Sequence, residues 1–225
     1  EEGLTWLEPA VHRAEQSLGP DHADTLELRS AQVRAYERLG RLDEAEQLAS
    51  GALRASRASH GDDHPGTLQR GKELASVLYS AGRLDEYEPL MRWVHDGELA
   101  LLGPDHRAVL VSARNLALID LQRGRLAKAE EELRALAART EQLLGPDDLE
   151  TLATRSDLAG VLIETGRGAE AETWLVPLVR DLEAFDPSGG GRLAEAAERL
   201  ARAVALQSRD AEARRLFDEA ERLIE

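Results

Sequence analysis

The sequence has no cysteine, which excludes disulfide bonds, thiol catalysis and cysteine-ligated zinc sites. It also has no apolar run close to the about 20 residues needed to cross a bilayer. Basic residues are scarce: 28 Lys and Arg face 43 Asp and Glu, giving a formal net charge of −15. This charge disfavours binding to nucleic acid or to an anionic membrane, because like charges repel. Together these features predict a soluble, cytoplasmic protein without a nucleic-acid or membrane partner.

Two landmarks recur along the chain, each at a step of 42 residues. The first is a Gly-Arg pair, found at Gly40-Arg41, Gly82-Arg83, Gly124-Arg125 and Gly166-Arg167. The second is a Gly-Pro-Asp-like loop, which begins at Gly19, Gly61, Gly103 and Gly145. Apolar residues between the landmarks follow helical spacing, and no segment alternates with period two. Each repeat is therefore predicted to be two helices joined by a tight turn.

The landmark residues fit the ends of these helices. The glycines of both series stand where a helix ends in a left-handed conformation. The aspartates of the loop are predicted N-caps of the next helix: Asp21, Asp63, Asp105 and Asp147. The predicted helices cover about 2–18, 22–39, 42–60, 64–81, 84–102, 106–123, 126–144, 148–165, 168–185, 192–207 and 210–224.

The repeated residues resemble the tetratricopeptide repeat in its 42-residue, kinesin-light-chain-like form. The resemblance is carried by Leu18–His22, Leu39–Glu46, Leu102–His106 and Leu116-Ala117. It implies an all-α fold, a right-handed superhelical solenoid of antiparallel helix pairs with about five repeats, the first incomplete. We expect a single domain over 1–225, with a half repeat at 1–18, full repeats at 19–60, 61–102, 103–144 and 145–186, and a degenerate closing pair at 187–225.

Motifs of catalytic or cofactor chemistry are weak in this sequence. Gly66–Glu73 nearly spells a phosphate-binding loop, but it lies inside a predicted helix and Glu73 replaces the Ser or Thr that holds magnesium. The His60–His64 loop lacks a zinc spacing. His22, His64 and His106 share one repeat position, which predicts that each caps or packs its own loop. We therefore expect no enzyme activity, no cofactor and no metal.

Several residues depart from the repeat. Tyr87 replaces the small residue that follows the turn at Ala45, Ala129, Ala171 and Ala213, so its ring should separate the helices or turn outward. Asp120 interrupts an apolar series and needs a cation, for which Arg123 and Arg114 are candidates. Gln32 stands where other repeats have leucine. Trp6 and Trp174 share a position that favours packing between helices. Drift and function both remain open for the first three departures.

The family resemblance implies a concave groove lined by the first helix of each pair. Its inward polar residues would include Ser30, Arg34, Arg38, Lys72, Ser76, Arg114, Asn115, Asp157, Glu198, Arg199 and Arg202. The basic members of the N-terminal half would form a positive strip that suits an acidic protein or peptide segment. The alternative is that these charges pair within the chain.

The resemblance implies a non-enzymatic scaffold for protein or peptide binding, as in the C-terminal sensor or regulatory arm of a larger bacterial signalling protein, a STAND-type ATPase or a transcriptional regulator. The alternatives are a self-associating or intramolecular packing arm, and the recruitment domain of an enzyme. The chain opens on Glu1 without an initiator methionine or signal peptide, so we expect it to be a fragment. Leu4, Trp6, Leu7 and Val11 of the half repeat would then favour self-association.

Overall fold

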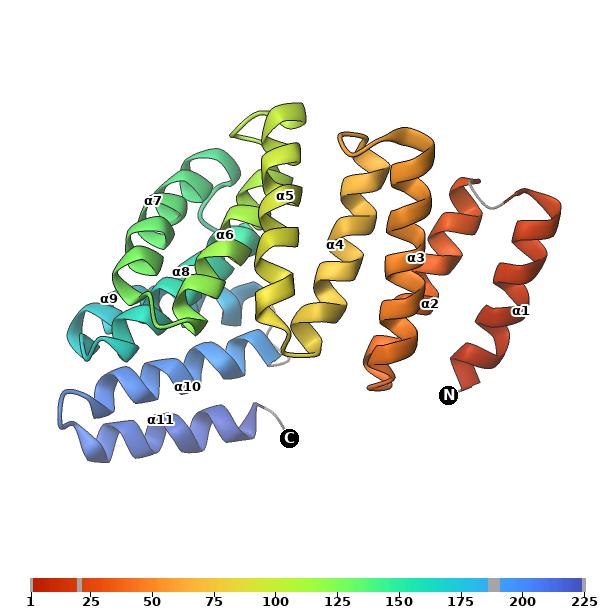
Figure 1. Ribbon diagram of the computed structural model, residues 1–225. Coiled ribbons are helices and arrows are strands. Elements are labelled where there is room, and N and C mark those ends of the chain that lie inside the picture. Colours follow the sequence, from red (N-terminus) through yellow and green to blue (C-terminus); the bar gives the residue numbers. More distant parts are fainter. Residues whose placement is uncertain (1, 20–21, 186–190, 224–225) are drawn as a thin grey trace. The chain divides into compact units, whose positions relative to one another are not determined.

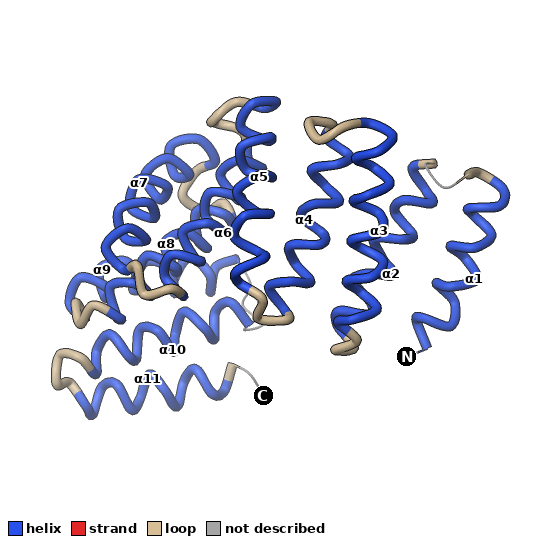
Figure 2. The backbone as a smooth tube through the Cα atoms, viewed as in Figure 1, coloured by secondary structure: helices blue, strands red, loops and turns tan. Residues whose placement is uncertain are grey.

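The computed structural model describes residues 2–19, 22–185 and 191–223, and within them the chain forms eleven α-helices and no strand (Figures 1 and 2). The helices are α1 (Glu2–Ser17), α2 (Ala23–Arg38), α3 (Leu42–His60), α4 (Pro65–Ser80), α5 (Leu84–Leu102), α6 (Arg107–Gln122), α7 (Leu126–Leu144), α8 (Leu149–Glu164), α9 (Gly168–Phe185), α10 (Gly191–Ala205) and α11 (Asp210–Arg222). Their ends differ from the predicted ones by only one or two residues, because the 42-residue step fixes every turn. None of these helices is long and apolar enough to cross a membrane.

The chain divides into two compact units, Glu1–Val109 and Leu110–Glu225. In the first unit each helix from α1 to α5 packs against the next one in the chain, and α2 also contacts α4. In the second unit the same holds from α7 to α11, and α8 also contacts α10. Consecutive helices therefore form antiparallel pairs, as the repeat predicts. The division into one half repeat, four full repeats and a closing pair stays a prediction.

Each unit buries its own apolar cluster. The cluster of the first unit contains Val33, Tyr36, Ala45, Ala49 and Val77. The cluster of the second unit is larger and includes Leu133, Leu158, Leu162, Leu175 and Leu178, none of which has any exposed surface. The alanines that follow the Gly-Arg turns, Ala45, Ala129 and Ala171, are buried, as expected for residues between two closely approaching helices.

The turns and caps of the repeat partly confirm the sequence prediction. The glycines of the Gly-Arg pairs have φ between 70° and 75°, the left-handed conformation that only glycine adopts without strain. The prediction of aspartate N-caps is wrong by one residue. Instead, the side chains of His22, His64 and Asp148 cap α2, α4 and α8. The histidines thus cap their own loops, as their shared position indicated, whereas Asp21 lies outside the described residues.

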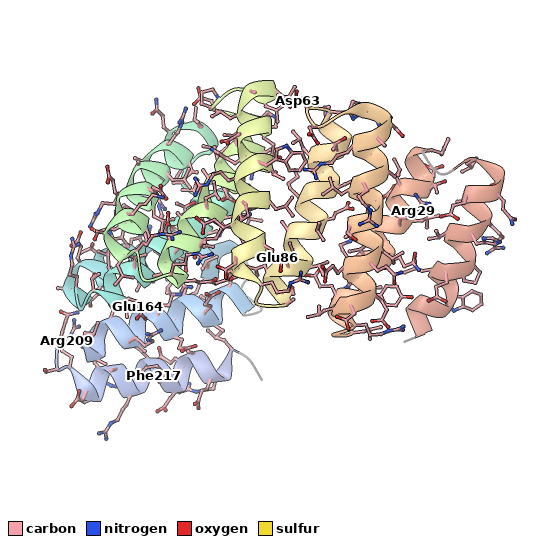
Figure 3. The ribbon with its side chains drawn as sticks, in the orientation of Figure 1. Arg29, Asp63, Glu86, Glu164, Arg209 and Phe217 are labelled. Carbon is pink, nitrogen blue, oxygen red and sulfur yellow. The ribbon has the colours of Figure 1, made fainter. Side chains whose placement is uncertain are left out.

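The arginine of the Gly-Arg pair connects neighbouring repeats. Arg83 bonds Glu86 of its own helix at 2.6 Å and Glu46 of the preceding second helix at 2.5 Å. Arg167 makes the same two contacts with Glu170 and Glu130. At the next turn, labelled in Figure 3, Arg209 bonds Glu212 and Glu172. Sequence reasoning assigned a role to the glycine of this pair and missed the role of the arginine.

The phosphate-loop-like segment Gly66–Glu73 lies within α4, as the repeat register requires. Gly71, the second glycine of this segment, has a packing role. A Cβ atom on Gly71 would lie 2.4 Å from the ring of Trp93, so the absence of a side chain lets α5 approach α4 closely.

Tyr87 does not turn outward. Its side chain is buried, and its ring lies 5.4 Å from that of Tyr79 in a tilted arrangement. Trp6 and Trp174, in contrast, differ although they share a repeat position. Trp174 packs against the core of the second unit, whereas Trp6 is 78% exposed. The packing prediction is wrong for Trp6, because α1 contacts α2 and no other described helix of its unit.

Candidate partner-binding surface

The exposed cations of α2 are Arg34 and Arg38, which lie one helical turn apart. The Nε of Arg38 donates to the backbone carbonyl of Arg34 at 3.3 Å. Within the part of the chain that the structure describes, neither guanidinium has a carboxylate partner. These two arginines can therefore offer their charge to another molecule.

Glu37 lies between these arginines in sequence and connects α2 to α4. Its Oε1 accepts hydrogen bonds from Ser76 at 2.9 Å and from Ser80 at 2.5 Å. Ser76 is exposed on α4, but its hydroxyl is engaged within the chain. The three residues place a hydrogen-bonded surface beside the two free cations.

Lys72 is held by a carboxylate of α5. Its Nζ lies 2.7 Å from Oε1 of Glu98, whose side chain is only 4% exposed. The other oxygen of Glu98 is buried and has no hydrogen-bond partner among the described residues. For Lys72 the pairing within the chain is therefore the observed arrangement, and its partner is Glu98.

A second intramolecular network lies next to the Lys72–Glu98 pair in the first unit. Arg70 donates to Ser30 at 2.6 Å and to Glu73 at 2.7 Å. Ser30 also donates to Glu73 at 2.8 Å, which joins α2 to α4. Ser30 is consequently buried in this network and does not face a partner.

In the second unit, Arg114 of α6 connects to two carboxylates of α8. It bonds Glu150 at 2.6 Å and Asp157 at 2.8 Å. Burial alone would lower the pKa of Arg114, but the two carboxylates outweigh it and raise the pKa. Burial raises the pKa of Asp157 despite the attraction of Arg114. Most of the charge of Arg114 is thus neutralised within the chain.

Arg199 of α10 continues this network. Its Nη1 lies 3.6 Å from Asp157 and donates to the Ser156 hydroxyl at 2.9 Å, while its Nη2 bonds Glu195 at 2.5 Å. Asn115 is half-buried beside Arg114 in the sequence. Glu198 is exposed, and Arg202 pairs with Glu164 at 3.0 Å.

The cation partners of Asp120 differ from those predicted. Its carboxylate, 3% exposed, bonds Arg125 and, at 2.8 Å, Lys128. Arg114 is instead engaged by α8. The turn after α6 brings the start of α7 back to the end of α6, which favours residues beyond the turn over Arg123. Burial would raise the pKa of Asp120, but the hydrogen bonds from Lys128 and Arg125 lower it below its usual range.

The residues predicted to line the groove therefore fall into two groups, those available to a partner and those bonded within the chain. Arg34 and Arg38 remain available, whereas Lys72, Ser76, Arg114, Asp157 and Arg199 are bonded within their own units. Opposite charges 43 residues apart, as in Arg114 and Asp157, were a sequence signal for this pairing. No group of three or more His, Asp or Glu side chains in the described ranges is arranged to hold a metal ion.

Comparison with known proteins agrees with this geometry. The family model described as Tetratricopeptide repeat matches residues 32–86 and 111–176, more than half of the chain. The chain belongs to the tetratricopeptide repeat family. A search of the curated proteins finds no match to the sequence.

Solved structures of other tetratricopeptide-like proteins share the fold. A Podosopora anserina protein assigned to the kinesin light chains, with nearly identical TPR-like repeats, is 23% identical, with 90% of this chain and 96% of that one covered and a TM-score of 0.73. BtubC (BKLC) from P. vanneervenii is 16% identical, with 98% and 89% covered and a TM-score of 0.80. The apo form of the quorum sensor NprR from B. thuringiensis is 18% identical, with 99% and 71% covered and a TM-score of 0.59.

Proposed function

We propose that this chain is a non-enzymatic scaffold that binds an acidic segment of a protein or peptide along its first helices. Membership of the tetratricopeptide repeat family supports the general role, because stacked helix pairs offer an extended surface for partners. The observation that carries the proposal is the state of Arg34 and Arg38. Both are exposed and lack a carboxylate partner within the described residues, although the chain carries a net charge of −15.

The expected contribution of these arginines is moderate. A partly exposed ion pair contributes about 0.5–1 kcal/mol, because water and salt screen it and the side chains lose freedom. Two such pairs amount to about 1–2 kcal/mol, or roughly a five- to thirty-fold change in affinity. Lys72 of the same unit should add less, since a partner would have to compete with Glu98.

Selection from a displayed library of short peptides tests this role. We expect the selected peptides to be rich in Asp and Glu and to bind less tightly as salt is added. The double variant Arg34→Glu and Arg38→Glu should weaken the selected peptides about tenfold or more while helical circular dichroism is unchanged.

The matched control is Arg214→Glu with Arg215→Glu, which changes the net charge equally on the exposed face of α11. This control should leave the affinity nearly unchanged. Equal losses in the two double variants would show that net charge alone controls binding. Selection of neutral or basic peptides would contradict the proposed acidic partner.

We infer that the scaffold acts in the cytoplasm as the sensor or regulatory arm of a larger bacterial signalling protein, either a STAND-type ATPase or a transcriptional regulator. This context rests on the family resemblance. The coding sequence that precedes Glu1 tests it. An ATPase or DNA-binding domain there would support the inference, and a catalytic domain of another kind would favour recruitment to an enzyme.

A further inference from the structure

A cavity of about 540 Å³ lies between α1, α2, α3 and α4 in the first unit. Apolar wall residues come from three of these helices, and polar side chains complete the lining. The residues that matter for its chemistry are Val11, Gln32, Val33, Leu48, Ala52 and Arg54. This volume lies within the roughly 300–1,000 Å³ range of small-molecule sites, which are mostly apolar with a few polar groups.

One residue of the cavity wall departs from the later repeats, and another is small. Gln32 occupies the position that is leucine in every later repeat, at Leu74, Leu116, Leu158 and Leu200. Ala52 occupies the position of the larger Val94, Leu136 and Leu178 and of the equally small Ala10 and Ala220. Compared with the repeats that have leucine or valine at both positions, the wall has less apolar volume here, and Gln32 adds a polar side chain to the lining.

The other charged groups of the wall are paired with one another. Arg29, labelled in Figure 3, lies 2.7 Å from Glu15. Arg70 lies 2.7 Å from Glu73 and is 9% exposed. Gln32 is 8% exposed. The wall of the cavity therefore presents apolar surface, one amide and internally paired charges.

Arg54 is the exception among these charges. It lines the cavity and is exposed, and its Nη2 lies 4.0 Å from where a Cβ on Gly51 would stand. The guanidinium therefore lies close to the backbone of α3 at the rim of the cavity. In the part of the first unit that the structure describes, Arg54 makes no hydrogen bond or ion pair. The cavity consequently has an apolar interior and one uncompensated positive charge at its rim.

We propose that this cavity binds a small amphipathic monocarboxylate, with its apolar body against Val11, Val33 and Leu48 and its carboxylate on Arg54. Burial of the apolar body provides the driving force, and a charge-assisted hydrogen bond fixes the orientation. A small-molecule site of this kind goes beyond the protein-binding role, because it lies between the helix layers rather than on the exposed arginines of α2.

Calorimetric titration of the whole chain with phenylbutyrate tests the site, with phenylbutyramide as the uncharged analogue. We expect the carboxylate to bind about tenfold or more tightly than the amide, the difference that a hydrogen bond to a charged group provides. Saturating phenylbutyrate should also raise the melting temperature, because a ligand that binds only the folded state stabilises it. Equal affinities for the two compounds, or no binding of either at millimolar concentration, would overturn the proposal.

Two variants locate the site. Gln32→Leu with Ala52→Leu introduces the leucine pair that stands at these positions in two later repeats, Leu116 with Leu136 and Leu158 with Leu178. Filling the cavity in this way should abolish phenylbutyrate binding while raising the melting temperature. Arg54→Gln leaves the cavity open and should remove the preference for the carboxylate over the amide. The control is Arg92→Gln on the exposed surface of α5, where Arg92 pairs with Glu88. Unchanged carboxylate preference in Arg54→Gln, or an equal loss in Arg92→Gln, would place the site elsewhere.

Discussion

Nδ1 of His64 accepts a hydrogen bond from the backbone N–H of Gly66 at 3.1 Å. His22 and His106 make the same bond to Asp24 and Ala108, at 3.2 and 3.1 Å. Since a backbone N–H can only donate, the accepting nitrogen of each imidazole is unprotonated. Three first helices therefore begin with a neutral histidine cap, while α8 begins with the carboxylate of Asp148.

Replacement of this cap should change stability in both directions. His64→Ala removes an acceptor from the start of α4 and should lower the free energy of unfolding by about 1 kcal/mol. His64→Asp should recover the loss or exceed it, because a carboxylate also interacts favourably with the positive end of the helix. Urea denaturation of the three proteins measures the effect. A His64→Asp variant no more stable than His64→Ala would contradict the capping role.

The ion pairs of Asp120 predict how stability depends on pH. Its pKa is lowered in the folded protein by Lys128 and Arg125. The stabilisation is therefore complete above the ordinary carboxyl pKa of about 4 and is lost as the pH falls through the lower folded value. Asp120→Asn should destabilise the protein at pH 7 by about 1–2 kcal/mol, with the difference from the parent vanishing in strong acid.

Denaturant midpoints from neutral pH down to strong acid provide the measurement. Glu131→Gln on the exposed surface of α7 serves as the control, because it removes one carboxylate without breaking a buried pair. A constant difference between Asp120→Asn and its parent at every pH would show that Asp120 contributes by shape rather than by charge.

The sequence was sufficient for the fold because each turn contains a residue with one physical task. The glycines of the Gly-Arg pairs must adopt positive φ, and their regular step fixes where each helix ends. The charged contacts were less predictable. Whether Lys72 meets Glu98 or a partner depends on how far one helix is shifted along the next, which composition and spacing do not specify. The cation partners of Asp120 were not predictable for the same reason, because they depend on the geometry of the turn between α6 and α7.

The candidate site, like the fold, could be predicted from the sequence only in part. Arg34 and Arg38 are exposed on α2, and their place in a partner-binding groove stays a prediction from the resemblance. The cavity beside Gln32 was not foreseen, although part of its signal was present: Gln32 replaces the leucine of every later repeat, and Ala52 is smaller than Val94, Leu136 and Leu178, though not than Ala10 and Ala220. Comparing all core positions between repeats, rather than the polar departures alone, would have found it.

The buried carboxylate of Glu98 predicts a stabilising substitution. One repeat earlier, Ser56 and Thr67 share a hydrogen bond of 2.8 Å, and the residues that stand at these positions in the next repeat are Glu98 and Val109. One oxygen of Glu98 has no partner among the described residues, and Val109 has no side-chain donor. Val109→Thr should supply a hydroxyl donor and raise the free energy of unfolding by about 1 kcal/mol.

A double-variant cycle checks this assignment. With Glu98→Leu already in place, Val109→Thr should destabilise the protein, because its buried hydroxyl would then lack an acceptor. Additive effects of the two substitutions would contradict a bond between these residues.

The exposed ring of Trp6 predicts self-association through α1. Its side chain is 78% exposed, whereas Leu7 is half-buried and Val11 is buried against the first unit; the side chain of Leu4 lies outside the described residues. Covering an exposed indole with a second copy of the chain removes apolar surface from water and so lowers the free energy of the system. We expect the sedimentation coefficient of the chain to rise with protein concentration, and Trp6→Lys to abolish the rise. Val176→Lys, which replaces another apolar residue more than half exposed, is the control and should leave association unchanged. Association that persists in Trp6→Lys, or disappears equally in Val176→Lys, would assign the contact to another surface.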